Sequence, residues 1–291
     1  MRFSITIVAA AVWAGVACAG MAAERELEML KNCRLVPTEW ADGDSFEIET
    51  PAGRRHTLRL YGADCFEWHV SDESDARRLR AQRRYFGMTG FGGSAEKSIS
   101  AAKELGETAA KETVQLLGEP FTVHTSYADA LGDGKHRRIY AFVTTAAGED
   151  LAGQLVKAGL ARAFGVYRET PAGKSKADYQ ATLADLELQA AKRGTGAWKF
   201  TNWENLPAER NLEREENEDL GLATSDKLPP GSKIDPNTAS RDDLMKLPGV
   251  GEATANRIIE GRPFKSAADL DRVPGIGPGT LARLKPHLEI R

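Results

Sequence analysis

Two short runs of alternating residues, joined by a tight turn, carry acidic residues at both ends. The first run follows Asp44, the turn is Pro51-Ala52-Gly53, and the second run passes through Arg59 to Asp64. A β-hairpin of this length brings its ends together, so the carboxylates of Asp44 and Asp64 should lie beside each other. Arg59 and Glu67 fall within a few residues of that pair. Two acids, a candidate base and a cation indicate phosphodiester chemistry.

Size and charge limit what surrounds this hairpin. The chain has 291 residues, which is long enough for two domains with separate cores. Hydrophobic residues make up 41% and charged residues 28%, which are ordinary fractions for a soluble protein and exclude global disorder. The net charge of −3 gives no overall attraction to nucleic acid. Any such binding must use local basic patches, bridging cations or backbone amides.

The N-terminus has the pattern of a signal peptide. Arg2 precedes an apolar run at residues 5–17, and small residues follow it. The run is too short to span a bilayer comfortably but suits a signal-peptide core. We therefore predict a signal peptide at residues 1–23 and an exported protein, periplasmic or extracellular, with no stable membrane span. A retained anchor and a lipid attached to Cys18 are the alternatives.

Export affects the interpretation of the two remaining cysteines. Cys33 lies just before the first candidate strand, and Cys65 lies inside the candidate site. An oxidising compartment would permit a disulfide between them, worth roughly 2–4 kcal/mol. Spacing alone does not show that the sulfurs meet. Two small buried thiols are the equal alternative.

The first two hundred residues contain five strand candidates and several helices. Alternating patterns predict strands within residues 34–62, 121–125 and 139–145. Helical spacing and end signals predict helices over residues 95–117, 150–157 and about 179–190. Five strands with helices packed beside them resemble a small closed β-barrel of the oligonucleotide-binding (OB) type, which is an α+β arrangement. Such a fold does not by itself define a function.

An arginine-rich segment interrupts this pattern at residues 68–105. Residues 72–85 are charged on every side and include five arginines, and a glycine-rich stretch follows at residues 86–94. The charged run is typical of a solvated helix, and the glycines predict a flexible segment. The functional alternative is an arginine flap that gathers phosphates beside the site.

Several motifs resemble the staphylococcal nuclease (thermonuclease) family in order and approximate spacing over residues 33–200. They are Asp42-Gly43-Asp44-Ser45, Arg59 to Glu67, Arg137 ahead of Ile139-Tyr140-Ala141, Leu155 to Ala161, and Ala191 to Trp198. The resemblance implies an OB-fold domain over residues 24–200 that cleaves DNA and RNA. It also implies that Arg59 and Arg137 clamp the scissile phosphate, while Glu67 positions or deprotonates the attacking water.

The same resemblance implies a Ca²⁺ cofactor. Asp44 and Asp64 would bind the ion through their side chains and Cys65 through its backbone carbonyl, since calcium prefers hard oxygen ligands. Tyr167 and Lys135 are the expected substrate contacts. Cys65 stands where the family usually has threonine, and Phe66 stands where it usually has proline. These departures affect substrate preference and rate more than reaction type.

Residues 201–232 read as a linker that keeps two domains apart. They are rich in acids and amides, and residues 228–232 have no helical or strand period. A repeat follows, because residues 240–251 recur 26 positions later as residues 266–277. Each copy offers a capping residue, an apolar stripe, a Gly-x-Gly turn and a second helix. Residues 233–291 are therefore predicted to form a small all-α domain of paired helical hairpins.

These copies resemble the double helix-hairpin-helix domain, and the lead-in resembles that of exported DNA receptors of bacterial competence. Glycines let the backbone approach a phosphate, and helix N-terminal amides would bind it without reading base identity. The predicted DNA contacts are Gly249, Val250, Gly251, Gly275, Ile276, Gly277, Lys246, Arg257, Arg272 and Arg283. A protein-interaction module is the alternative.

Together these features predict an exported, monomeric, calcium-dependent nuclease with a C-terminal, sequence-independent DNA tether. A detached tether predicts that removing residues 233–291 leaves cleavage of short oligonucleotides nearly intact. The competing hypothesis is a non-enzymatic DNA-binding or DNA-uptake protein with an inactive nuclease-like barrel. A protein-interaction scaffold is a third.

Overall fold

The computed structural model describes residues 26–130, 137–224 and 233–290, with the side chains of 217–224 left aside. The predicted signal peptide at 1–23 and the candidate substrate contact Lys135 lie outside these ranges. Within the described ranges, every helix is too short or too polar to cross a membrane.

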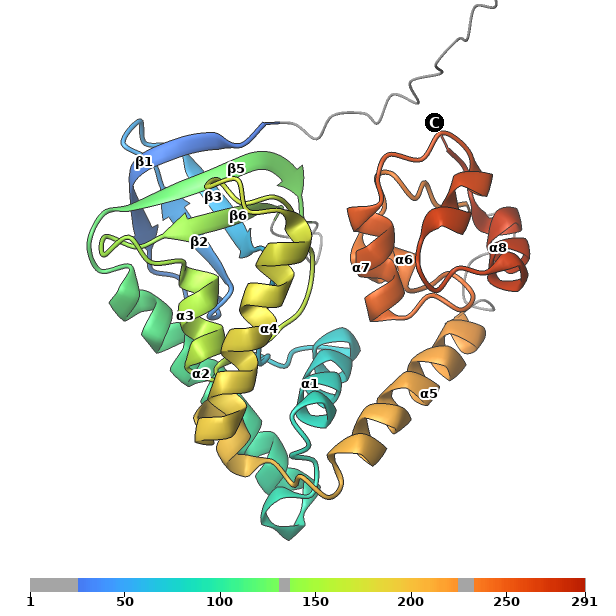
Figure 1. The fold of residues 1–291 in the computed structure, drawn as a ribbon, viewed down its shortest axis with the longest axis horizontal. Coiled ribbons are helices and arrows are strands. Elements are labelled where there is room, and N and C mark those ends of the chain that lie inside the picture. The colour runs from blue at the N-terminus through green and yellow to red at the C-terminus, as the bar shows by residue number, and fades with distance from the viewer. Residues whose placement is uncertain (1–25, 131–136, 225–232, 291) are drawn as a thin grey trace, which may run out of the picture.

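Five strands close into the predicted barrel (Figure 1). They are β1 (Glu28–Val36), β2 (Ser45–Glu49), β3 (Arg55–Leu60), β5 (Phe121–Asp129) and β6 (Arg138–Thr144). Their order around the barrel is β1-β2-β3-β6-β5, and only the β3–β6 pairing is parallel. Outside the barrel, β4 (Ala63–Cys65) pairs antiparallel with β7 (Ala161–Ala163). The prediction of a closed five-stranded barrel is confirmed, and β4 carries one of the two predicted acids.

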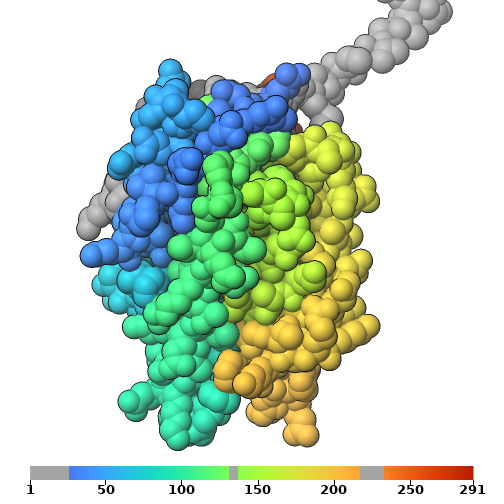
Figure 2. Space-filling model, turned by 90° about the vertical axis from the view of Figure 1, so that its left-hand side faces the viewer, coloured from blue at the N-terminus to red at the C-terminus, as the bar shows by residue number. Residues whose placement is uncertain are grey.

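Three helices pack beside the barrel at or near the predicted ranges. They are α2 (Ala95–Leu116), α3 (Leu151–Lys157) and α4 (Lys176–Arg193). Ser94, Asp150 and Ser175 cap their first turns by accepting a backbone N–H three residues ahead. Gly194 ends α4 in the left-handed conformation. Figure 2 shows α2 and α4 on the face where the N-terminal strands lie above them.

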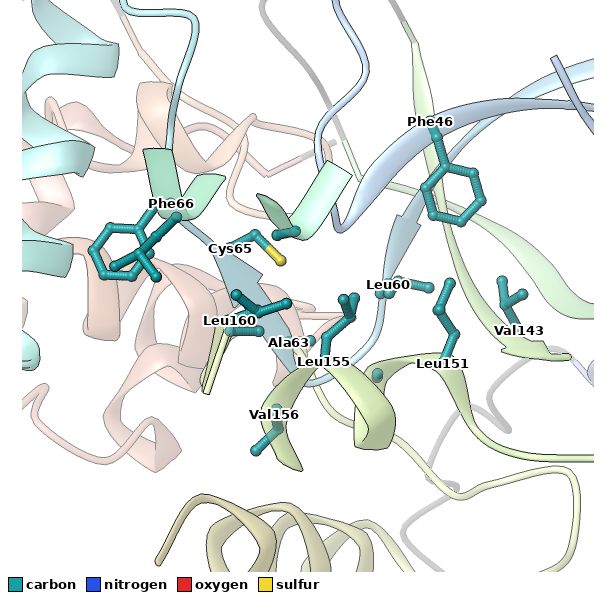
Figure 3. Close-up of a cluster of buried hydrophobic side chains, with 14 of the residues drawn as sticks. Phe46, Leu60, Ala63, Cys65, Phe66, Val143, Leu151, Leu155, Val156 and Leu160 are labelled. Atoms are coloured by element: carbon teal, nitrogen blue, oxygen red, sulfur yellow. The ribbon is translucent and has the colours of Figure 1, made fainter. Parts of the chain in front are cut away.

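The core lies between the barrel and these helices. Phe46 and Leu60 from the hairpin strands pack with Leu151 and Leu155 of α3, and all four are at most 2% exposed. Cys65 lies within the same cluster (Figure 3). Each such side chain contributes roughly 1.5–3 kcal/mol by leaving water. Cys65, which lies beside the catalytic candidates, is thus fixed by core packing.

The arginine-rich segment begins with a helix that packs against other helices. It forms α1 (Glu73–Tyr85), followed by Phe86 and Met88, both fully buried. Phe86 stacks on Phe66 with ring centroids 5.1 Å apart. A short 3-10 turn, η1 (Phe91–Gly93), then leads into α2. Phe86 and Met88 thus anchor the start of the glycine-rich stretch in the core, whereas residues 90–94 are exposed and their flexibility stays a prediction.

The predicted linker is largely helical. Helix α5 (Leu206–Thr224) follows η2 (Gly196–Phe200) and packs along α1 (Figure 1). Arg80 of α1 lies 2.5 Å from Glu216, and Arg84 lies 3.2 Å from Glu213. Two acids of this segment therefore neutralise two of the five arginines of α1. Sequence composition alone had suggested a solvated spacer.

The C-terminal repeat forms a separate all-α unit with its own core. It comprises α6 (Arg241–Leu244), α7 (Glu252–Glu260), η4 (Ala267–Arg272), α8 (Pro278–Leu284) and η5 (Lys285–His287). Gly249 and Gly275 have φ of 79° and 97°, which favours glycine. The glycines two positions later are the N-cap residues directly before α7 and α8. The predicted internal repeat is confirmed in the backbone.

Candidate active site

Arg59 joins the two predicted carboxylates. Asp44 stands directly before β2 and Asp64 lies in β4, and each is 1% exposed. The Nη1 of Arg59 lies 3.0 Å from Asp44 Oδ1, and its Nη2 lies 2.5 Å from Asp64 Oδ1. The hairpin register pairs Ser45 with Arg59, which puts this arginine at the open end of the hairpin. The structure therefore brings the acid pair and the cation together as expected.

Asp42 and the backbone of Cys65 fix the orientation of Asp44. The Asp42 carboxylate accepts the N–H groups of Asp44 and Ser45, at 3.1 and 2.7 Å. Asp42 thus serves the turn, an ordinary use of Asp in a loop. Asp44 Oδ2 accepts the Cys65 N–H at 2.6 Å. The carboxylates of Asp42 and Asp44 are thus both held by hydrogen bonds from backbone N–H groups.

Glu67 lies in a pocket of about 170 Å³ together with Asp42, Ser45, Arg78 and Arg138. Its carboxylate lies 2.8 Å from Arg78 Nε of α1. Burial raises the pKa of Glu67 above its usual value, Arg78 and Arg59 oppose this, and Asp64 and Asp44 add to it. A carboxylate with a raised pKa in a pocket is a candidate general base.

Arg138, rather than the predicted Arg137, lies at this pocket. Arg138 donates from Nη1 to Ser45 Oγ at 3.2 Å. Arg137 instead lines another cavity, with Tyr61 and Tyr167. Neighbouring strand residues face opposite sides, and the sequence reading of this strand was shifted by one residue. Burial along β6 gives no signal that could have found it, because Tyr140 and Phe142 are buried like Ala141 and Val143.

The two cysteines are free, buried thiols. Burial raises the pKa of Cys33, and burial together with Asp44 and Asp42 raises that of Cys65 well above its usual range. Both thiols are therefore weak nucleophiles. The sequence left a Cys33–Cys65 disulfide and two buried thiols as equal alternatives. The structure has the two buried thiols.

The predicted calcium ligands are hard oxygen donors, and each already has partners. Gln82 of α1 donates its amide to Asp64 Oδ2 and to the Cys65 carbonyl, at 3.0 and 2.6 Å. Arg162 of β7 donates to Asp64 Oδ2 at 2.7 Å. In the ranges that the structure covers, there is no cluster of three or more His, Cys, Asp or Glu side chains arranged for a metal. The predicted set has only two carboxylates, and its third donor is main chain.

The charge around these oxygens suits a cation. Burial, followed by the like charges of Asp44 and Glu67, raises the pKa of Asp42 well above its usual value. Crowded carboxylates of this kind are costly without a positive partner. Two carboxylates and a carbonyl are also the donors that calcium prefers. The residues therefore fit calcium in donor type. Burial would raise the pKa of Asp64, but Arg162 and Arg59 hold it well below its usual range, so these arginines and Gln82 must share its oxygens with the ion.

Tyr167 belongs to a buried aromatic cluster. It is 6% exposed and packs with Tyr61, Tyr140 and Tyr179. The cluster borders a cavity of about 580 Å³ that also includes residues of the C-terminal unit. Tyr167 thus lines the same cavity as Arg137 and not the pocket of Glu67, so its role as a substrate contact stays a prediction.

The glycines of both hairpins meet in one pocket of about 510 Å³. A side chain at Gly249 would come within 3.1 Å of Arg283, and one at Gly275 within 3.0 Å of Arg257. The arginine of each repeat therefore lies over the hairpin of the other. Arg214 of α5 also lines this pocket, which the sequence did not suggest.

The other predicted DNA contacts differ in their surroundings. Lys246 is paired with Asp243 at 2.5 Å. Arg272 donates to the carbonyls of Gly261 and Pro263, at 2.8 and 2.5 Å, so it closes the repeat internally. Val250 and Ile276 are buried in the C-terminal core, and Gly277 caps α8. Only the backbone of these three can face a phosphate.

Sequence reasoning missed several residues that the structure places at the site. They are Arg78, Gln82, Arg138, Arg162 and Glu252. Gln82 lies in a segment that read as a solvated helix, and Glu252 comes from the separate repeat. Neither has a local pattern that points to the acids.

Comparisons with known proteins match two parts of the chain. Residues 57–200 match the family described as staphylococcal nuclease homologue, and residues 230–289 match the helix-hairpin-helix motif. A deoxyribonuclease of Thioalkalivibrio sp. (strain K90mix) is 46% identical over 56 residues, which are 19% of this chain and 16% of that protein. Photosystem II extrinsic protein U of Picosynechococcus sp. (strain ATCC 27264 / PCC 7002 / PR-6) is 41% identical over 59 residues, which are 20% of this chain and 43% of that protein. The chain thus spans less than half the length of either relative.

Proposed function

We propose that this chain, which contains a staphylococcal nuclease homologue domain followed by a helix-hairpin-helix motif, is an exported, calcium-dependent nuclease. Its substrate is the phosphodiester bond of DNA, and RNA is a second substrate class to be tested. The C-terminal unit holds DNA without regard to base sequence. The relative named a deoxyribonuclease supports the DNA assignment.

The observation that carries this proposal is the convergence of two arginines on one hydroxyl. Arg59 and Arg138 both donate to Ser45 Oγ, at 3.3 and 3.2 Å. Two guanidinium groups in close approach repel each other. Arg59 has Asp44 and Asp64 as anionic partners, whereas burial and the charge of Arg59 lower the pKa of Arg138. The Arg138 Nε–H is buried and has no hydrogen-bond partner among the described groups. A phosphate bound here would accept from both arginines and satisfy that donor.

The neighbouring residues supply the remaining chemistry. Glu67 faces the pocket that Ser45 and Arg138 line, so it can accept a proton from a water attacking the phosphorus. Arg59 and Arg138 would stabilise the negative charge that builds on the phosphate oxygens. Bound calcium, held by Asp44, Asp64 and the Cys65 carbonyl, would add positive charge beside the same phosphate.

The C-terminal unit would hold DNA near the barrel. Arg257 and Arg283 lie over glycine turns whose backbone can approach a phosphate closely. Holding DNA here raises its local concentration at the barrel. Export is supported by the apolar run at residues 5–17, and an extracellular or periplasmic setting makes calcium available.

Cleavage of plasmid DNA by the mature protein tests the proposal. We expect calcium to support cleavage, EGTA to abolish it, and Arg138→Gln to reduce it severely while the protein stays folded by circular dichroism. Binding of plasmid without any cleavage in calcium would favour the competing function, a DNA-binding or DNA-uptake protein with an inactive barrel. That alternative is credible because Arg162 and Gln82 already occupy the oxygens of Asp64.

A further inference from the structure

We propose that the C-terminal domain completes the nuclease site, with Glu252 acting as a positioning residue that holds Arg162 on Asp64. This inference rests on the proposed nuclease function. It adds a role for the helix-hairpin-helix domain beyond that of a tether. It also assigns Arg162 and Glu252 to the catalytic neighbourhood.

The first step is the contact between Arg162 and Asp64. The two residues are direct partners across the β4–β7 pair, and Arg162 Nε lies 2.7 Å from Asp64 Oδ2. Arg162 is 4% exposed, and its guanidinium lies 4.0 Å from the centre of the Phe164 ring. The arginine is therefore confined between a carboxylate and an aromatic face.

Arg162 also contacts the C-terminal domain. Arg162 Nη2 lies 3.4 Å from Glu252 Oε2, and Glu252 is 6% exposed. Arg162 thus has one anion on each side, Asp64 in the nuclease domain and Glu252 in the C-terminal domain. A guanidinium with two anions is fixed in its plane, since different N–H groups are engaged. Its direction toward Asp64 then depends on Glu252.

A second set of ion pairs links the same two domains. Glu252 Oε1 lies 3.2 Å from Arg241, whose neighbour Asp242 lies 3.6 Å from Arg78. Arg78 in turn pairs with Glu67 at 2.8 Å. The C-terminal domain therefore touches the candidate metal ligand through Arg162 and the candidate base through Arg78. A detached tether would have neither contact.

Position within α7 links this network to the DNA-binding hairpin. Glu252 is the first residue of α7, immediately after Gly251, and both line the 510 Å³ pocket of glycines and arginines. DNA phosphates at that pocket would lie next to the residue that holds Arg162. Glu252 thus lies at the DNA-binding pocket and also contacts the arginine that holds Asp64. This side chain couples DNA binding at the hairpins to the geometry of Asp64.

The test uses a substrate that cannot bridge the two sites. The full mature chain is assayed with a nitrophenyl ester of thymidine phosphate, which carries a single nucleotide and no further DNA for the hairpins to hold. The variant is Glu252→Gln. The matched control is Glu260→Gln, which removes another interdomain pair of the same helix, 2.9 Å from Lys176, with no link to Asp64.

We expect Glu252→Gln to lower kcat on this ester by about tenfold with little change in KM, because a small misorientation of a reacting group is costly. Glu260→Gln should keep the wild-type kcat. If Glu252 acts through Arg162, its effect should vanish in an Arg162→Lys background. Equal kcat for Glu252→Gln and wild type, or additive losses in the double variant, would overturn the proposal.

A readout independent of activity separates this inference from the proposed function. In ¹⁵N spectra of the full chain, the Arg162 Nε–H should be protected from exchange, and Glu252→Gln should speed its exchange while Glu260→Gln should not. If the wild-type chain cleaves no phosphodiester, the nuclease assignment fails, and the exchange measurement still decides whether Glu252 fixes Arg162. Equal exchange in all three proteins contradicts the positioning role.

Discussion

Adjacent residues of a β-strand face opposite sides, and at the start of β6 this separates two arginines. Arg138 reaches Ser45 in the acidic pocket, whereas Arg137 is exposed and lines a different cavity. Only the first can contact a phosphate that also touches Arg59. The phosphate clamp therefore depends on the strand register and not merely on an arginine-rich loop.

Replacing the two arginines one at a time measures this difference. Arg138→Gln should lower kcat by roughly two to three orders of magnitude, the usual loss when a transition-state charge partner is removed. Arg137→Gln is the control, because it removes the same charge, and it should lower kcat much less. Steady-state cleavage of a short oligonucleotide checks both variants. The reverse ranking would restore Arg137 as the second clamp.

The pH dependence of activity should report Glu67. The pKa of this carboxyl is raised above its usual value of 4.5, with Arg78 opposing the rise. A general base acts when ionised, so activity should fall as the pH drops through a midpoint above that value. Arg78→Gln removes a cation that favours the ionised form, so the midpoint should move to higher pH.

Profiles of kcat/KM against pH check this shift. Arg80→Gln is the control, because Arg80 lies on the same helix but pairs with Glu216. An acid limb that is the same in the wild type and Arg78→Gln would show that the titrating group is not Glu67.

Residue-level reasoning from sequence succeeded where the chemistry is local. The hairpin ends brought Asp44, Arg59 and Asp64 together, since a two-stranded turn fixes which residues meet. It failed for Gln82 and Glu252, whose contacts with the site span 18 and 90 residues of sequence. Such distant pairings leave no periodic trace. Only packing of the whole chain defines them.

Among the helices, α2 shows how closely an element must fit the site segment. A Cβ at Gly106 would lie 2.5 Å from the Phe66 carbonyl oxygen and 3.0 Å from Trp68 Cβ. That segment directly follows Cys65 and includes Glu67. The glycine lets α2 press against the main chain that carries the candidate base.

Gly106→Ala should therefore destabilise the nuclease domain despite the better helix propensity of alanine. We expect a loss of about 1–3 kcal/mol in the free energy of unfolding, because the backbone must move apart. Gly279 in α8 has open space where a Cβ would lie. Gly279→Ala should be neutral or raise stability by up to about 1 kcal/mol. Urea denaturation of both variants compares them, and a stable Gly106→Ala protein would contradict the close fit.

Helices α1 and α5 mark the limit of composition as a guide to elements. Each segment alone is too charged to predict burial, and the sequence suggested a solvated helix and a spacer. Together their charges are complementary, and Arg210 of α5 lies 4.4 Å from the ring centre of Tyr85 in α1. Two segments more than a hundred residues apart thus explain each other's composition.

At the scale of the whole molecule, DNA affinity should be set by a few local cations, because the net charge is negative. Arg257 and Arg283 lie over the hairpin glycines and are the cations placed to meet phosphates there. Each phosphate contact adds about 0.9 to the slope of log affinity against log salt concentration.

Replacing Arg257 or Arg283 with glutamine should therefore weaken binding for all duplex sequences alike and reduce the salt slope by about one. Arg272→Gln is the control, because Arg272 does not line the hairpin pocket and donates to the carbonyls of Gly261 and Pro263. Fluorescence anisotropy with two unrelated duplexes at several salt concentrations measures both quantities. An unchanged slope in Arg257→Gln and Arg283→Gln would place the DNA elsewhere.

The packing of α5 has a practical consequence for anyone who divides this chain for expression. The compositional border near residue 200 looks like a safe place to cut, yet Trp203 stacks on Trp198 and Leu206 covers Gly87. A fragment ending at 200 would expose these apolar surfaces and leave Arg80 and Arg84 without their acids. Soluble fragments of the barrel domain should therefore extend through residue 224, and failure of a shorter fragment to fold would reflect its design and not its catalytic residues.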